Sequence, residues 1–264
     1  MEFSILFMVV SVLLLLERVP RLRCEALPLV RRYAGTDMIY LLSSGILLSL
    51  AARDLAGRLL APERGFAASL PLYAGAFVLF DAGAYVSHRL LHRVGALWAL
   101  HKVHHSSRSL DWLATFRGHI LEHGIRQLFS PVLLIAAGVP LTVVGPTAAL
   151  HAAWAAFVHS NLAPRLRWLD PICITPRLHR LHHVAATCDR NFGTVFSAWD
   201  RLSGTLLTDT AAGSGGPLGV PGQIDTYPQT WGAQLVEPLR ELLRPPPALI
   251  RRNAGAPGRR PLHG

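Results

Sequence analysis

The chain is poor in charged residues, and nearly all of its positive charge comes from arginine. Of 264 residues, 16% are Asp, Glu, Lys or Arg, whereas soluble globular proteins average about 25%. Only one of the 26 basic residues is lysine, and the formal net charge is +10. A basic chain can bind nucleic acid or a membrane surface. Because 51% of the residues are apolar and no nucleic-acid recognition motif is visible, we exclude nucleic acid and expect a membrane.

Cysteine is also scarce. Cys24, Cys173 and Cys188 are far apart and form no C-x-x-C pair. Neither a disulfide framework nor a thiolate metal site is therefore expected. No stretch shows the alternation of a β-strand, and the sequence favours an all-α fold.

Long apolar runs predict an integral membrane helical protein. They cover residues 1–16, 36–52, 67–87 and 128–158. The last run is interrupted by Gly138, Pro140, Gly145 and Pro146, and its 31 residues are too many for one span and few for two. We expect about three spans, followed by a helical hairpin that enters and leaves the membrane on the same side. The first run is followed by arginines, unlike a signal peptide, so we interpret it as an uncleaved span.

The basic residues predict which side of the membrane each loop occupies. Segments 17–32, 88–127 and 160–264 hold 23 of the 26 Lys and Arg residues. Three spans and a returning hairpin put these segments on one face, which should be cytoplasmic. We expect N-terminal spans in residues 1–66, a histidine-bearing domain with the hairpin in 67–210, and a loosely structured Gly- and Pro-rich tail in 211–264.

Nine histidines in four segments are the main functional signal. They are the pair in "HRLLH", the triplets in "HKVHH" and "HRLHH", and one at the end of the hairpin: His88, His92, His101, His104, His105, His159, His179, His182 and His183. Spacings of three and four residues put imidazoles on one side of a helix. Imidazole binds Fe, Zn, Cu and Ni, and nine ligands are too many for one ion but suit two. We predict that each triplet supplies both ions, and we interpret His151 and His263 as ordinary polar residues.

An aspartate inside the third apolar run is unusual. Asp81 lies seven residues before His88, on the same face of the predicted helix. An ionisable group in a span is costly and commonly has a functional partner. We expect Asp81 to orient a ligand histidine; the alternative is a carboxylate that reaches the interface.

These boxes, followed by "NFGTVFSAWDRLSGT", resemble the fatty acid hydroxylase / sterol desaturase superfamily over about residues 81–207. The resemblance implies a non-haem di-iron centre whose metal ligands are the nine histidines, with His159 matching a further family histidine in "FVHSN". It places Asp81, His119 and Asn191 beside the cofactor, and makes Glu122 of "FRGHILEHG" a neighbour of the site. Some members have a second histidine where this chain has Ala155.

The resemblance implies an O2-dependent enzyme that hydroxylates or desaturates a fatty acyl, sterol or related lipid at the cytoplasmic side of the membrane. The chain contains no His-Pro-Gly-Gly haem motif. We therefore expect electrons from a separate protein, of the ferredoxin or cytochrome b5 type. A histidine-rich metal transporter and a non-catalytic metal-binding membrane protein remain alternatives. Transporter ligands lie near the membrane midplane, whereas these boxes are flanked by arginines that belong at the surface.

Overall fold

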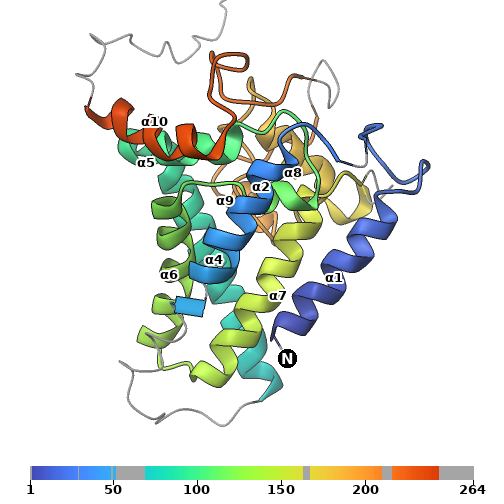
Figure 1. The fold of residues 1–264 in the computed structure, drawn as a ribbon. Coiled ribbons are helices and arrows are strands. Elements are labelled where there is room, and N and C mark those ends of the chain that lie inside the picture. Colours follow the sequence, from blue (N-terminus) through green and yellow to red (C-terminus); the bar gives the residue numbers. More distant parts are fainter. Residues whose placement is uncertain are drawn as a thin grey trace, which may run out of the picture.

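The computed structural model describes residues 2–28, 30–48, 50–51, 69–162, 167–209 and 216–243. Within these residues the fold is helical, with isolated β-bridges and no strands, which confirms the predicted all-α class. The elements are α1 (Glu2–Leu16), α2 (Ala34–Tyr40), η1 (Leu41–Leu47), α4 (Leu70–Arg93), α5 (Gly95–His105), η2 (Trp112–Phe116), α6 (Ile120–Ala136), α7 (Leu141–His159), η3 (Arg167–Leu169), α8 (Pro176–His183), α9 (Ala198–Leu202) and α10 (Trp231–Leu243). Long helices stand side by side, and most of the shorter elements gather at one end, while η1 lies along α6 (Figure 1).

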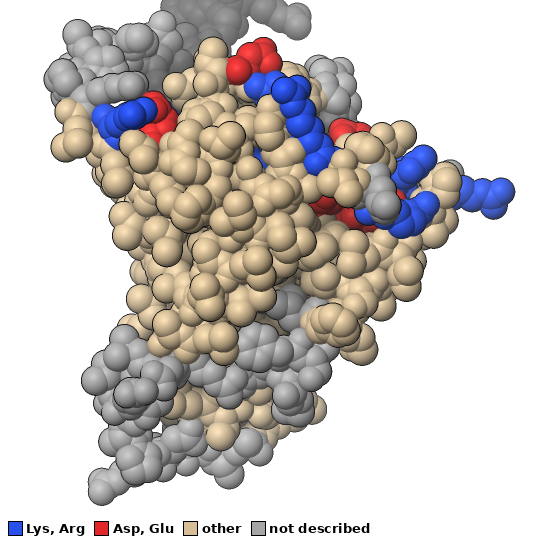
Figure 2. Space-filling model, in the orientation of Figure 1, with Lys and Arg blue, Asp and Glu red and all other residues tan. Residues whose placement is uncertain are grey.

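Two helices of the described chain, α4 and α7, are long and apolar enough to cross a membrane. Helix α1 is also apolar and packs against α7, but it has only 15 residues. Large apolar side chains on the long helices are exposed, among them Val86, Val132 and Leu150. In Figure 2 the charged residues lie in the upper part of the molecule, and no Asp, Glu, Lys or Arg is visible among the described atoms below. This distribution fits a membrane protein with one polar end.

Helices α6 and α7 form the predicted hairpin, but with different breaks. The turn contains Gly138, at φ 81°, and Pro140, which precedes the first residue of α7. Pro146 lies inside α7 instead of ending it. Proline cannot donate to the carbonyl four residues earlier, and the Thr142 carbonyl accepts from the Tyr73 hydroxyl at 3.4 Å. A side chain of α4 thus compensates for the hydrogen bond that Pro146 cannot make.

Helices α4 and α6 approach closely at a glycine. A Cβ on Gly83 would lie 2.9 Å from Ser130 Oγ. That hydroxyl donates to the Phe80 carbonyl at 2.9 Å, across the interface. Below this contact, a buried apolar cluster joins α4, α6 and α7; it contains Ala76, Phe80, Leu134, Val143 and Val144. The rigid contact fixes where the upper ends of these helices lie.

The tail is more ordered than its composition predicts. Val220 and Tyr227 pack with Tyr40 and Val103 in a buried cluster, and α10 lies across α5 (Figure 1). The expectation of loose structure is therefore wrong for residues 216–243. Glycine and proline are frequent in this part of the chain, and the prediction from its composition overlooked a few well-spaced apolar side chains that pack. The predicted tail residues 211–215 and 244–264 lie outside the described residues.

Candidate metal centre

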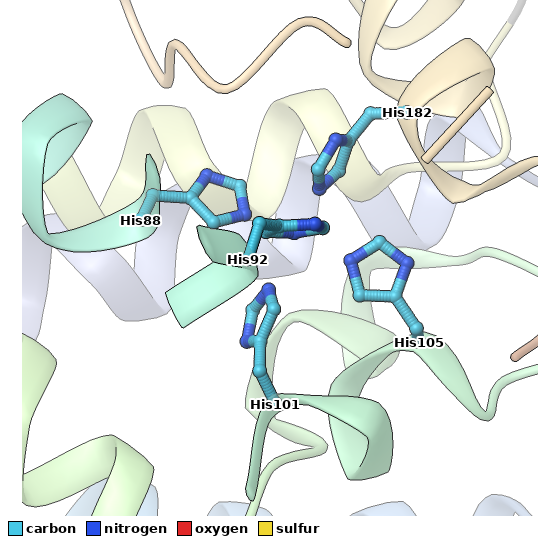
Figure 3. A group of neighbouring side chains, drawn as sticks. All are labelled: His88, His92, His101, His105 and His182. Atoms are coloured by element: carbon cyan, nitrogen blue, oxygen red, sulfur yellow. The ribbon is translucent and has the colours of Figure 1, made fainter. Parts of the chain in front are cut away.

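All nine predicted histidines are buried and converge at the polar end of the long helices. They form two groups, in each of which one ring nitrogen per residue lies within 4.8 Å of the others. The first group contains His88, His92, His101, His105 and His182, and the second contains His104, His159, His179 and His183. Figure 3 shows the five rings of the first group pointing toward one another.

The two triplets are divided between the groups in opposite ways. Helix α5 gives two histidines to the first group and only His104 to the second. Helix α8 gives only His182 to the first group and two histidines to the second. Helix α4 contributes to the first group alone, and α7 contributes His159 to the second. Each triplet therefore reaches both groups, as its spacing predicted.

The ring nitrogens suit a positively charged ligand. In the second group His159 Nε2 lies 3.2 Å from His104 Nε2 and 2.9 Å from His179 Nε2. In the first group the Nε2 atoms of His88, His101 and His182 are buried without a hydrogen-bond partner. Buried polar atoms are normally satisfied, and neutral imidazoles whose lone pairs face one another are held together well by a metal cation. An all-nitrogen donor set fits iron, zinc, copper or nickel.

Hydrogen bonds on the outer ring nitrogen orient five of these histidines. The Nδ1 contacts are His88 with the Phe192 carbonyl (2.8 Å), His104 with the Arg117 carbonyl (2.9 Å), His159 with the Ala155 carbonyl (2.7 Å), His182 with the Arg190 carbonyl (2.7 Å) and His101 with Glu122 Oε1 (2.9 Å). A carbonyl only accepts, so Nδ1 carries the proton and Nε2 presents its lone pair to the group. The prediction that Glu122 neighbours the site is confirmed.

Burial also keeps the histidines of α5 and α8 in the form that binds metals. It lowers the pKa of His101, His104 and His105 well below the ordinary 6.5, and neighbouring imidazoles lower each of these values further. Burial lowers the pKa of His182 to about 4, although the hydrogen bond that His182 donates to the Arg190 carbonyl acts in the opposite direction. These rings are therefore neutral near pH 7, as a metal ligand must be.

A buried ionic network supports the second group. Arg117 is 1% exposed, and its carbonyl accepts from His104. Its guanidinium donates to Asp37 Oδ1 at 2.5 Å and to Gln229 Oε1 at 3.0 Å. Asp37 also pairs with Arg31, which binds Asp111 through two hydrogen bonds of 2.7 and 2.8 Å. The network ties α2, η2 and the C-terminal segment to the backbone that orients His104.

Asn191 supports the first group without belonging to it. Its backbone is left-handed, with φ 54°, a conformation that asparagine tolerates better than most residues. Its amide donates to the carbonyls of Leu178 and Leu207, both at 2.9 Å, and its Oδ1 accepts from the Leu207 backbone at 2.7 Å. Asn191 lies between Arg190 and Phe192, so it fixes the two carbonyls that orient His182 and His88.

Two other predicted residues lie outside both groups. The expectation that Asp81 orients a ligand histidine is wrong. Its Oδ1 lies 3.0 Å from Nε2 of His151, a histidine outside the groups, and it also accepts from backbone N–H groups at 195 and 196 and from the Trp199 indole. The segment after α8 packs against α4, and its N–H groups donate hydrogen bonds to this carboxylate. His119 caps the start of α6, and its Nε2 contacts the Leu235 carbonyl at 3.1 Å.

The sequence did not indicate which groups accept the hydrogen bonds that these histidines donate. The carbonyls of Arg117, Arg190 and Phe192 hold three of the rings. Every residue has a carbonyl, so no side-chain pattern could have identified these three.

Comparison with known proteins identifies the family. The model of the fatty acid hydroxylase family matches residues 73–205, half of the chain, and the match includes every histidine of both groups. The chain belongs to the fatty acid hydroxylase family. This family contains iron-dependent oxygenases, which agrees with the nitrogen donors of the two groups.

Curated relatives are similar over the same region. Ornithine lipid hydroxylase OlsE of Rhizobium tropici is 33% identical over 163 residues, which are 61% of this chain and 48% of that protein. Alkylglycerol monooxygenase of Homo sapiens is 31% identical over 134 residues, covering 50% of this chain and 29% of that protein. The enzyme of that name from Danio rerio is 30% identical over 138 residues, covering 51% and 30%. The chain thus spans about half the length of the first relative and under a third of the others. No solved structure matches it.

Proposed function

We propose that this protein is a membrane-bound di-iron oxygenase that hydroxylates a lipid, with the first and second histidine groups each holding one iron ion. The observation that carries the proposal is the convergence of nine buried imidazoles into two adjacent groups. A group of five and a group of four are about the number of protein ligands that two ions with open positions require. Hydroxylation is favoured over desaturation because the relatives are named a hydroxylase and a monooxygenase.

The protein's own residues prepare the site in three ways. Four backbone carbonyls fix the ring orientation and the tautomer of four histidines, and Glu122 orients the ring of His101. Phe192, fully buried, lies 5.0 Å from the His92 ring and helps to exclude water. Iron held here would supply the redox chemistry by which O2 oxidises an unactivated C–H bond. The overall reaction consumes one C–H bond, one O2, two electrons and two protons, and it yields an alcohol and water.

The position of the groups supports a lipid substrate and a membrane location. Both groups lie where α4 and α7 end, above the helical stretches whose apolar side chains are exposed. A lipid can therefore keep its chains in the bilayer while another part of it reaches the site. Loops at this end carry most of the Lys and Arg residues, which supports a cytoplasmic site. We infer that the two electrons come from a separate ferredoxin or cytochrome b5-type protein.

Metal transport fits the arrangement less well. A transport site exchanges its ion through an open path near the midplane and uses broken helices. The histidines here are at most 5% exposed, and their outer nitrogens are largely fixed by hydrogen bonds. Such fixed ligands suit a resident ion.

The proposal is tested by iron content and lipid oxidation in parallel. Purified full-length protein should contain two iron ions per chain, and cells that express it under 18O2 should accumulate a lipid heavier by one labelled oxygen. His182→Ala removes a ligand from the first group, and His104→Ala removes one from the second. Each should lower the iron content and abolish the labelled product.

His151→Gln is the matched control, because this histidine is buried outside both groups and glutamine can still donate to Asp81. It should retain iron and product. A lipid that loses two hydrogens instead would make the enzyme a desaturase. Wild-type protein that binds no iron, or that carries zinc and oxidises no lipid, would overturn the proposal.

A further inference from the structure

A cavity of about 720 Å³ lies at the polar end of the molecule, beside the first histidine group. Its walls come from α5, α10 and the segments around residues 185–190, 207–209 and 221–223. Cavities of this size hold small ligands or the polar part of larger ones. Asp189 and Asp209 in the wall have side chains that are 56% and 67% exposed, so the cavity opens to the surface.

The inner end of the cavity is formed by a member of the first group. His92 lines it, is 95% buried, and has no hydrogen-bond partner on either ring nitrogen, although its Nδ1 lies 3.5 Å from Asp189 Oδ1. In Figure 3 the His92 ring lies among the other four rings. Trp98, also in the wall, lies 4.8 Å from His92 and 5.4 Å from His105, centroid to centroid. A ligand in this cavity therefore meets His92 of the first group directly.

The wall carries charges of both signs. Lys102 and Arg190 are cationic, and Asp189, Asp209 and Glu241 are anionic. Lys102 pairs with Glu241, and the Arg190 guanidinium donates to the Gly204 carbonyl at 2.9 Å. An alkyl chain placed here would displace water from these ions and give nothing in return, which is costly. A headgroup with one cationic and one anionic centre would replace that water with ion pairs.

We propose that this cavity binds a zwitterionic headgroup of the lipid substrate, so that the carbon oxidised lies in the headgroup or directly beside it. The inference rests on the proposed function, because it assumes that oxidation occurs at the first histidine group. The Trp98 ring and Leu207 offer an apolar strip along the wall for the first carbons of the attached chain. The rest of the lipid stays in the bilayer beside α4.

The test uses iron-loaded, full-length protein in maltoside micelles. Two zwitterionic lipids, phosphatidylethanolamine and an ornithine-headed lipid, are each compared with the N-acetylated form, which lacks the ammonium, and with diacylglycerol of the same chains. For at least one of the two zwitterionic lipids, the N-acetylated form should have a KM about tenfold higher or more. After turnover under 18O2, fragment masses should locate the label in the headgroup or on the first chain carbon.

Two variants test the cavity itself. Ala186→Trp fills it from an exposed wall position, and should abolish turnover of the zwitterionic lipid while iron content stays unchanged. Glu241→Gln alters the charge of the wall, and should raise KM severalfold with kcat unchanged. Glu237→Gln is the matched control, one turn earlier on the same helix and outside the wall.

The outcomes separate this inference from the proposed function. Label far along an acyl chain, together with wild-type kinetics for Ala186→Trp and Glu241→Gln, would overturn the headgroup site and leave the oxygenase intact. Equal KM values for zwitterionic, acetylated and neutral lipids would overturn it too. Protein that binds no iron and oxidises none of the lipids would instead refute the proposed function.

Discussion

Removing Asp37 should destabilise the protein strongly, because it would leave a buried guanidinium without a counterion. Asp37 is fully buried and accepts from both Arg31 and Arg117. In Asp37→Ala, Arg31 keeps the two hydrogen bonds to Asp111. Arg117, 1% exposed, would retain only the neutral acceptors Ser106 Oγ at 3.1 Å and Gln229 Oε1 at 3.0 Å.

The expected loss follows from the cost of an unpaired buried charge. Breaking a buried ion pair by removing one partner costs about 3–5 kcal/mol. At about 2–4 °C per kcal/mol for a chain of this size, Tm should fall by roughly 10 °C. Thermal unfolding of the purified protein in detergent measures this directly. Asp225→Ala is the control, since that carboxylate is 87% exposed beside Arg108 and should leave Tm unchanged.

A double variant separates the unpaired charge from a simple loss of packing. Arg117→Met removes the guanidinium but keeps the backbone carbonyl that accepts from His104. Asp37→Ala with Arg117→Met should be less destabilised than the sum of the single variants, because the double variant has no guanidinium at position 117 to be left unpaired. An Asp37→Ala variant within about 2 °C of wild type, or strictly additive effects, would refute the reasoning.

Three further predictions concern single carboxylates and one glycine. Glu122→Gln should keep its acceptor for His101 Nδ1 and bind iron normally, whereas Glu122→Ala should weaken iron binding about 10- to 100-fold in metal titrations; equal affinities would contradict the orienting role. A Cβ on Gly118 would lie 2.6 Å from Glu122 Oε2, so Gly118→Ala should weaken iron binding as Glu122→Ala does, and normal affinity would count against the contact. Burial raises the pKa of Glu17 to about 7; the folded form then binds the proton more tightly than the unfolded form, and stability falls as pH rises from about 4.5 through 7. Glu17→Gln should be within about 1 kcal/mol of wild type at pH 5 and exceed it at pH 8 by up to about 3 kcal/mol in unfolding free energy, and the same difference at both pH values would refute this.

Features of the site that depend on helix periodicity were predictable from the sequence. The spacing of His88 and His92 predicted a helix that continues past the apolar run, and α4 does continue to Arg93. Helix caps agree with this local reading: the Thr175 side chain accepts from the Leu178 backbone at 3.5 Å, and Pro176 follows as the first residue of α8. Such features depend on neighbours within one or two turns.

Features that depend on tertiary partners were not predictable. Asp81 shares a helix face with His88, but its partners are His151, 70 positions later, and a segment more than 100 positions later. Asp37 was counted as part of an apolar run, although it is the centre of a buried ionic network. In both cases a carboxylate in an apolar stretch did signal a specific partner. Which partner it has depends on how segments far apart in the chain pack together, and this packing cannot be predicted from the pattern of a single sequence.

The opposite division of the two triplets follows from helix geometry. At 3.6 residues per turn, the first and last histidines of a His-x-x-His-His box lie about 40° apart around the helix, and the middle one lies about 60° to the other side of the first. One box therefore presents a pair toward one group and a single ring toward the other. Helices α5 and α8 face each other across the site. The first and last rings of each box lie opposite the middle ring of the other box, so each group receives three rings from the two boxes. Inserting one alanine between His104 and His105 would rotate the last ring by about 100°. It should cost the first group a ligand while leaving His104 in the second, so iron binding should drop by about half and not vanish; complete loss of iron would show that the groups form only together.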